Sequence, residues 1–136
     1  MHPFTLVCLG LIMLISSGCQ IISPLFVDYY GVRRDVAQWI NQHQLLSMQQ
    51  KRLLVQLSRA QQQLRKIESK SAEQQIHIMK ENMMAIHCAT PYITEQKIQQ
   101  LQDKIFDPTE KQHILDFYNQ QRQNIQIDLN LVKCGH

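Results

Sequence analysis

Glycine and proline are nearly missing from most of this 136-residue chain. No glycine occurs between Val32 and Cys134, and only Pro91 and Pro108 interrupt that stretch. Because these two residue types are the usual breakers of helices, their scarcity favours long helices. The lack of glycine also excludes glycine-rich phosphate loops, and the chain has neither a nucleophile elbow nor a carboxylate pair placed against a histidine. We therefore expect no catalytic activity.

Aromatic residues make up only 7% of the chain, and acidic residues are scarce between Arg33 and Lys70. Eight basic residues in that segment face only Asp35 and Glu68. Such a segment can lie against anionic lipid head groups, meet an acidic partner, or form the solvated face of a helix. Nucleic acid is not an expected partner, because the segment has too few aromatic side chains to stack on bases.

Glutamine, leucine, lysine and arginine are abundant, and all four are good helix formers. Regularly spaced leucines and isoleucines give the chain an apolar face to bury, which argues against a disordered low-complexity tract. We predict an all-α fold, with one long helix over residues 32–87 and two shorter helices over 94–106 and 108–133 that fold back as a bundle. At 1.5 Å per residue, the first helix would be on the order of 80 Å long.

Apolar residues along the predicted long helix repeat at near-heptad spacing. One row contains Trp39, Leu46, Leu53, Ala60 and Ile67, and the other contains Val36, Leu57, Leu64 and Ile78. This spacing keeps a seam facing a partner helix, as in a coiled coil, and polar residues within it set register at a cost in stability. The polar residues in the seam are His43, Gln50, Ser71 and Gln74. We predict self-association, or docking on another helical protein, through a leucine seam made of Leu46, Leu53, Leu57 and Leu64.

Two start signals mark the shorter helices. Thr94 is a plausible cap for the second, and Asp107 followed by Pro108 and Glu110 is a strong start for the third. The end of the chain conflicts with a helix, because apolar and polar residues alternate there as in a strand. The alternating residues are Ile125, Ile127, Leu129 and Leu131. Since no second strand-like segment is present, we expect helix over residues 124–132 as well.

The amino-terminal stretch has an apolar run from Phe4 and ends in Leu14-Ile15-Ser16-Ser17-Gly18-Cys19. A short apolar segment that ends in small residues is typical of a secretory signal. With a cysteine directly after them, the stretch resembles the lipobox of bacterial lipoproteins. This resemblance implies a signal peptide over residues 1–18 and covalent lipid on Cys19. We expect a lipid-anchored tether over 19–31, followed by the helical domain over 32–136.

The residue after the cysteine bears on location. In that family, Gln20 in place of aspartate implies transfer to the outer membrane, on its periplasmic face. The alternative is an uncleaved helix that anchors the chain in the inner membrane, since residues 4–22 approach the roughly 20 needed to span a bilayer. Beyond the covalent lipid we expect no cofactor.

Cys88 and Cys134 remain as a pair when Cys19 carries lipid. In an oxidising compartment a disulfide is expected between them, and it would close a loop of about 46 residues. The alternative is zinc, because two thiolates with the imidazoles of His87 and His136 form an acceptable ligand set. The disulfide predicts a three-helix lobe over roughly residues 65–136, with the leucine seam outside it.

These features favour a non-catalytic lipoprotein of the cell envelope that binds a protein partner or spaces structures in the periplasm. Its size, anchor and cysteine pair are similar to those of the all-helical pilotins, which implies an assembly factor for an outer-membrane secretin as an alternative. Thr109 and Gln112 keep part of the spacing of the motif in the periplasmic Spy-like family. That resemblance implies a chaperone or metal-stress sensor as a further alternative, although a helix cap explains the same residues.

Overall fold

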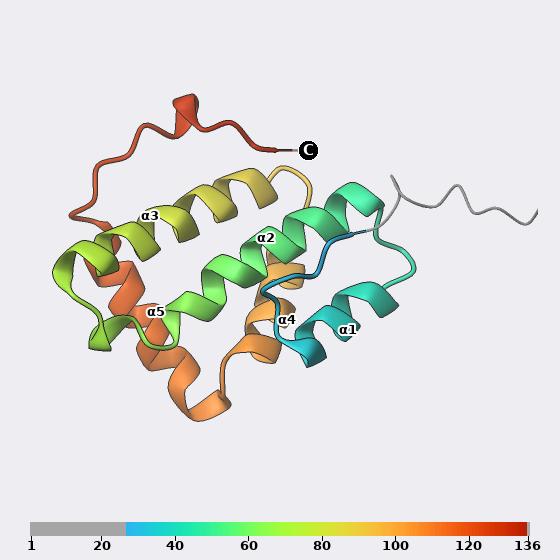
Figure 1. The fold of residues 1–136 in the computed structure, drawn as a ribbon, viewed down its shortest axis with the longest axis horizontal. Coiled ribbons are helices and arrows are strands. Elements are labelled where there is room, and N and C mark those ends of the chain that lie inside the picture. Colours follow the sequence, from blue (N-terminus) through green and yellow to red (C-terminus); the bar gives the residue numbers. More distant parts are fainter. Residues whose placement is uncertain (1–26, 136) are drawn as a thin grey trace, which may run out of the picture.

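The computed structural model describes residues 27–135 (Figure 1). The described chain forms five α-helices and two short 3₁₀ helices, and it contains no strand. The α-helices are α1 (Arg34–Gln42), α2 (Met48–Leu64), α3 (Ala72–Ala89), α4 (Glu95–Ile105) and α5 (Pro108–Arg122). The 3₁₀ helices are η2 (Ile67–Ser69) and η3 (Leu129–Leu131). The predicted all-α class is therefore confirmed for this part of the chain, whereas the predicted signal peptide and Cys19 lie outside it.

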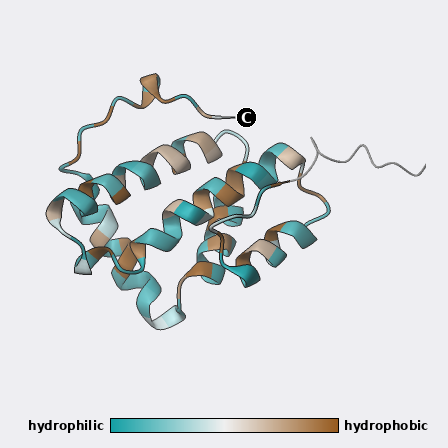
Figure 2. Cartoon of the chain, in the orientation of Figure 1, coloured by the Kyte–Doolittle hydropathy of each residue, from teal (hydrophilic) through white to brown (hydrophobic). Residues whose placement is uncertain are grey.

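Helix α2 lies at the centre, and α1, α3 and α4 pack against it. Its buried apolar side chains meet Val36 and Ile40 of α1, Ile78 of α3 and Leu101 of α4 in one core. Figure 2 shows hydrophobic and hydrophilic residues mixed along each helix, as expected for helices with one buried face. None of the described helices is long and apolar enough to cross a membrane.

The single long helix predicted over residues 32–87 is wrong, because the chain turns twice within it. Ser47 and Ser71 each begin a new helix with a capping box. Ser47 Oγ accepts from the Gln50 amide at 3.1 Å, and Gln50 Oε1 accepts from the Ser47 amide at 2.9 Å. Ser71 and Gln74 repeat the exchange at 3.3 and 3.2 Å. These side chains satisfy amides that an uninterrupted helix would bond internally. Of the polar residues in the predicted seam, Gln50, Ser71 and Gln74 therefore belong to helix starts, whereas His43 follows the end of α1.

The helix predicted over residues 94–106 starts almost where expected. Thr94 Oγ1 accepts from the Lys97 amide at 3.3 Å, and α4 follows directly. Asp107 and Pro108 stand at the start of α5 as expected, although the Asp107 side chain makes no capping hydrogen bond. Helix α5 ends at Arg122, well short of the predicted residue 133.

Residues 123–135 form an extended segment that runs back beside α3, which we call the carboxy-terminal strap (Figure 1). Ile125, Ile127 and Leu129 are half-buried while their neighbours are exposed, as the alternating pattern indicates. The turn of η3 then shifts the alternation, so that Leu131 is 78% exposed and Val132 and Cys134 turn inward. The prediction of helix over residues 124–132 is therefore wrong. The alternating apolar side chains pack on a helix surface instead of pairing with a second strand, and a disulfide holds the end of the segment.

Candidate functional site

The leucine seam is part of the interior. Leu53 is 2% exposed, Leu57 and Leu64 are fully buried, and Leu46 packs partly buried against the same core. The seam is covered because α1, α3 and α4 of the same chain surround α2. The predicted partner-binding seam is therefore wrong, and so is the separate lobe over residues 65–136, since α3 packs mainly on α2.

The predicted cysteine pair is confirmed as a disulfide. Cys88, near the end of α3, and Cys134, in the strap, have Cα atoms 5.5 Å apart and bonded sulfurs. Within residues 27–135, no group of three or more His, Cys, Asp or Glu side chains is arranged to hold a metal ion. The disulfide fixes the end of the strap over α3.

A chain of three amide side chains, of which Gln61 and Asn82 are buried, joins three helices. Gln61 Nε2 of α2 donates to Asn82 Oδ1 of α3 at 2.7 Å, and Gln102 Nε2 of α4 donates to Gln61 Oε1 at 3.4 Å. Asn82 Nδ2 is buried and has no hydrogen-bond partner in the described chain. The Asn82 side chain lies close to Tyr118, and this contact by itself lowers the pKa of Tyr118. Burial outweighs that contact and raises the pKa of Tyr118. Amides do not transfer protons at neutral pH, so this network specifies packing.

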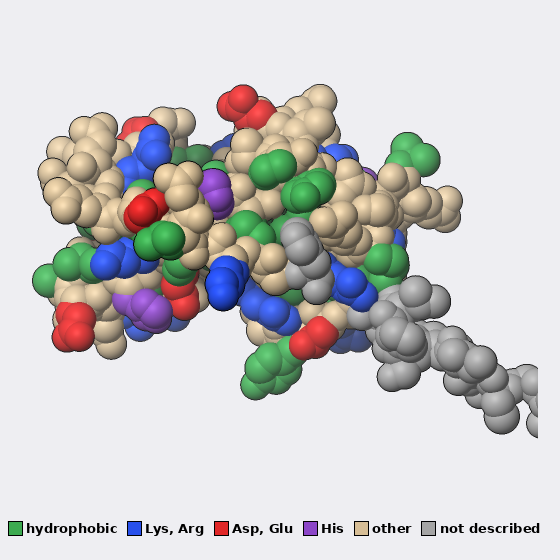
Figure 3. Space-filling model, turned by 90° about the horizontal axis from the view of Figure 1, so that it is seen from above, with side chains coloured by type: hydrophobic (Ala, Val, Ile, Leu, Met, Phe, Trp, Pro, Cys, Tyr) green, Lys and Arg blue, Asp and Glu red, His purple; other side chains and the backbone are tan. Residues whose placement is uncertain are grey.

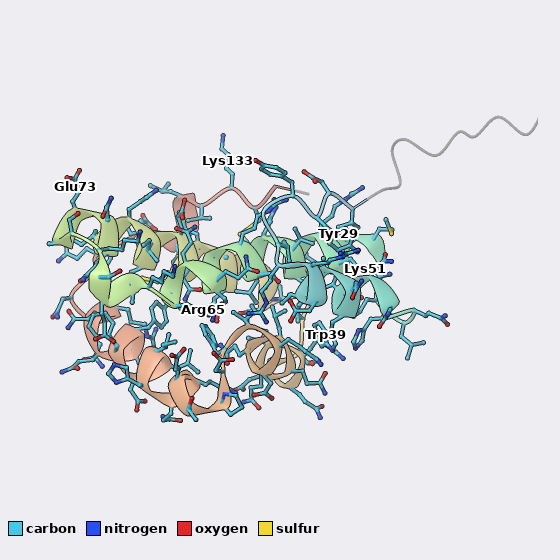
Figure 4. All side chains as sticks on the ribbon, turned by 60° about the horizontal axis from the view of Figure 1, so that its bottom comes forward. Tyr29, Trp39, Lys51, Arg65, Glu73 and Lys133 are labelled. Carbon is cyan, nitrogen blue, oxygen red and sulfur yellow. A yellow bond between two sulfur atoms is a disulfide. The ribbon has the colours of Figure 1, made fainter. Side chains whose placement is uncertain are left out.

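A groove lies on the surface between α2, α3 and the strap, and we call it the α2–α3 groove. Its volume is about 430 Å³. The lining residues are Gln56, Arg59, Ala60 and Gln63 of α2, Glu81, Met84, Ala85 and Cys88 of α3, and Val132, Lys133, Cys134 and Gly135 of the strap. Apolar side chains of α3 and the strap therefore lie beside amides and charges of both signs. Figure 4 shows Lys133 projecting from the strap above the helices.

The groove continues into a second hollow of about 540 Å³ where the described chain begins. Arg59 and Gln63 line both hollows, and Asp28, Tyr30 and Gly31 form the far wall. Arg59 holds this wall, because its Nε donates to the Tyr30 carbonyl at 2.6 Å and its Nη2 to the Asp28 carbonyl at 3.1 Å. Gly31 has a φ of +78°, a backbone conformation that glycine adopts readily.

The glutamines of α2 have a role that sequence reasoning missed. Gln62 Nε2 donates to the Gly31 carbonyl at 2.9 Å, and Gln62 Oε1 accepts from the Arg33 amide at 2.7 Å. Gln63 Nε2 donates to Glu81 Oε2 of α3 at 2.9 Å. Interpreted only as good helix formers, these residues in fact tie the entering chain and α3 to α2. A run of three glutamines in a helix was the available signal, since each amide can both donate and accept.

A second surface feature surrounds the only tryptophan, and we call it the Trp39 pocket. It measures about 500 Å³ and is lined by Trp39, Gln42, His43, Gln44, Leu45, Leu46 and Lys97. The rings of Trp39 and His43 meet edge to face with centroids 4.4 Å apart, and Lys97 Nζ lies 5.7 Å from the Trp39 ring centre. Leu45, in the loop between α1 and α2, is 99% exposed.

The remaining charges with shifted pKa values serve the fold. Hydrogen bonding to Arg33 lowers the pKa of Asp35, and the same contact raises the pKa of Arg33. Arg33 also donates to the carbonyls of Lys104 and Ile105, the last residues of α4. It thereby satisfies free carbonyls at a helix end and fastens α1 to α4. Thr109 and Gln112 are exposed on α5, and Gln112 donates to Asp116 within that helix.

No protein-family model, curated protein or solved structure matches this chain.

Proposed function

We propose that this chain is a non-catalytic envelope lipoprotein that binds a segment of a partner protein in the α2–α3 groove. In this proposal Cys19 carries the lipid that holds the chain on the periplasmic face of the outer membrane. The observation that carries the proposal is the groove itself, since its wall is fixed by the Cys88–Cys134 disulfide and its floor mixes apolar and amide groups. The leucine seam no longer supplies a binding face, because it is covered within the chain.

The chemistry of the groove favours a polypeptide as the occupant. Glutamine amides such as Gln56 and Gln63 can pair with the N–H and C=O groups of a backbone. Met84, Ala85 and Val132 offer an apolar surface for one or two side chains of that segment. Methionine adapts its shape to different side chains, which suits a surface that accepts a partner.

A pilotin-like assembly factor is the specific version of this function that the groove favours. Such a protein requires a concave groove in a helical body and acts as a monomer, whereas the Spy-like alternative requires a cradle-shaped dimer. The alternative in which the chain spaces structures in the periplasm loses its support, because the predicted long helix that would act as the spacer is three separate helices.

Photo-crosslinking in cells tests the binding site. A photoreactive amino acid at Gln63, which is exposed in the groove, should give one discrete heavier product that contains a second protein. The same group at Gln120, exposed on α5, is the matched control and should not give that product. The product at Gln63 should disappear in Ala85→Trp, because the new side chain fills the groove. Equal products from Gln63 and Gln120, or a product that Ala85→Trp leaves unchanged, would contradict the proposed site.

Lipidation has its own test. Growth with an alkyne-tagged fatty acid should label the wild-type chain, and Cys19→Ser should lose the label and leave the membrane fraction. Label that persists in Cys19→Ser would contradict lipidation at this residue.

A further inference from the structure

We propose that the end of the molecule formed by the Trp39 pocket and the exposed Leu45 loop rests on the phospholipid surface that holds the lipid anchor. This inference rests on the proposed function, because it uses the attachment at Cys19. It adds an orientation, with one specific face of the domain against the bilayer and the groove held in a fixed relation to it.

The first argument is the length of chain between the anchor and the fold. Val27 is buried in the core, and it lies only eight positions after Cys19 in the sequence. Even a fully extended chain of that length reaches no more than roughly 28 Å. An attached lipid therefore keeps Val27, and the end of the molecule around it, close to the head groups.

The second argument is what lies at that end. Tyr29 Oη donates to Asn41 Oδ1 at 3.3 Å, and Lys51 Nζ donates to the Asn41 carbonyl at 2.9 Å. Asn41 lies in the last turn of α1, directly before the loop that carries Leu45. Figure 1 shows the described chain beginning beside this loop, and Figure 4 places Tyr29, Trp39 and Lys51 at the same end of the molecule, with Glu73 at the opposite end.

The third argument is the chemistry of the surface. Leu45 is 99% exposed, which leaves a large apolar side chain in water unless another phase covers it. Trp39 and Lys97 stand beside it, and tryptophan and lysine are residues that favour the boundary between hydrocarbon and head groups. Helices α1 and α2 carry no acidic residue from Val36 to Leu64, whereas Lys51 and Arg52 follow the loop closely. Figure 3 shows several Lys and Arg side chains, with an acidic side chain beside them, on the face near the start of the described chain.

Glu95 and Asp28 are two carboxylates near this end of the molecule that already have partners. Glu95 accepts from Gln99 within α4, and the Asp28 carboxylate lies 3.7 Å from Arg59 on the side of the groove. The loop with Leu45 therefore combines an apolar tip with a basic surround, which fits a leaflet that contains anionic phospholipid.

The single tryptophan provides the test. The lipidated chain is reconstituted into vesicles of phosphatidylethanolamine and phosphatidylglycerol, with and without lipids that carry a nitroxide quencher near the head group. Vesicles are collected by flotation, so that every measured protein molecule is attached. We expect the nitroxide lipids to reduce Trp39 emission at least about twofold, since an indole in the interface lies within contact range of the quencher.

Two variants locate the contact. Leu45→Ser should lower the quenching by more than half while the protein still floats with the vesicles. Leu131→Ser, which removes another exposed leucine but from the strap, is the matched control and should leave the quenching unchanged.

Several outcomes would overturn the proposal. Attached protein whose Trp39 emission is insensitive to the nitroxide lipids would do so, as would equal quenching in Leu45→Ser and wild type. A dimer that dissociates in Leu45→Ser, together with unquenched Trp39, would assign the loop to a second copy of the chain. If Cys19→Ser floats as well as wild type, the lipidation fails, and the quenching still decides whether this face meets the bilayer. A lipidated chain that does not float contradicts both proposals.

Discussion

Helix α2 and the carboxy-terminal strap hold their places by different means. Helix α2 has 17 residues, of which eight are buried and packed against three neighbouring helices. The strap has no fully buried residue, and a covalent bond from Cys134 to Cys88 fixes its end. Many residues therefore determine the position of α2, whereas the position of the strap depends mainly on one pair. The α2–α3 groove lies where these two regions meet, so its floor is set by packing and one wall by a disulfide.

The largest expected effect breaks the packed side of this comparison. Leu57→Asp places a carboxylate without a partner in the core, and we expect a loss of more than about 4 kcal/mol in the free energy of unfolding. That loss is comparable to the total stability of many small domains, so the helical circular dichroism signal should collapse. Leu131→Asp on the strap is the control and should change stability by less than about 0.5 kcal/mol. A well-folded Leu57→Asp protein would restore the leucine seam as a free surface.

Removal of the disulfide addresses the strap. The double variant Cys88→Ser with Cys134→Ser should lose up to about 4 kcal/mol, the chain-entropy value for a loop of this length. Denaturant unfolding followed by circular dichroism measures the loss. Limited proteolysis should cut the strap first and leave α1 to α4 intact, because the strap adds only partly buried side chains to their core. Simultaneous cleavage throughout the chain would mean that the helical body depends on the strap after all.

Loss of the serine caps at the starts of α2 and α3 should have a smaller effect on stability, and the sign of that effect is informative. Ser47→Ala and Ser71→Ala should each lower the free energy of unfolding by about 1 kcal/mol, because each removes a capping hydrogen bond. If one helix ran through these positions, alanine would stabilise it by a few tenths of a kcal/mol instead. Ser47→Asp and Ser71→Asp keep a capping acceptor and serve as controls. Chemical denaturation of the four variants is sufficient to decide the sign.

Titration at high pH should give the smallest effect. Burial raises the pKa of Tyr118, so above the ordinary tyrosine value of about 10 the unfolded chain releases this proton before the folded chain does. The contribution to stability is complete below that pH and is lost as the pH rises through the folded value. Between about pH 9 and pH 11, on either side of the ordinary tyrosine pKa, the Tyr118→Phe variant should therefore lose less stability than wild type. Urea unfolding at each pH measures the difference. Tyr30→Phe, at an 85% exposed position, should behave as wild type.

The sequence predicts the second half of this fold better than the first. Two helix starts are recognisable in the sequence because a proline stands close to each. Thr94 follows Pro91 and Asp107 directly precedes Pro108, and α4 and α5 start there. Ser47 and Ser71 carry the same chemistry, but they stand in a stretch where serine and glutamine also fit a solvated helix face. The helix preferences of the neighbouring residues do not tell a helix start from the solvated face of a continuous helix. The chain turns at residues 43–47 because the turn lets Val36 and Ile40 pack on α2, and that gain is tertiary.

The leucine seam shows a related limit. Its residues were predicted to face a partner, but they face the interior of the same chain, because the spacing of apolar residues marks a face to be covered and does not say which chain covers it. The groove was not predictable either, because it depends on the path of the strap over α3. The cysteine pair was predictable because, once Cys19 is assigned to lipid, Cys88 and Cys134 leave one simple pairing. The observed disulfide brings residue 134 back to residue 88.

The disulfide also determines how the molecule would respond to mechanical force. It closes residues 88–134 into a covalent ring that contains α4, α5 and the strap, whereas α1, α2 and most of α3 stay outside it. Tension along the amino-terminal chain would enter at Val27 and load first the hydrogen bonds that Arg59 and Gln62 make to residues 28–31. These bonds would be the first to rupture, and the ring could not be lengthened by such a pull. If lipid at Cys19 held the domain, load would thus extend it from its amino-terminal end while residues 88–134 kept their covalent loop closed.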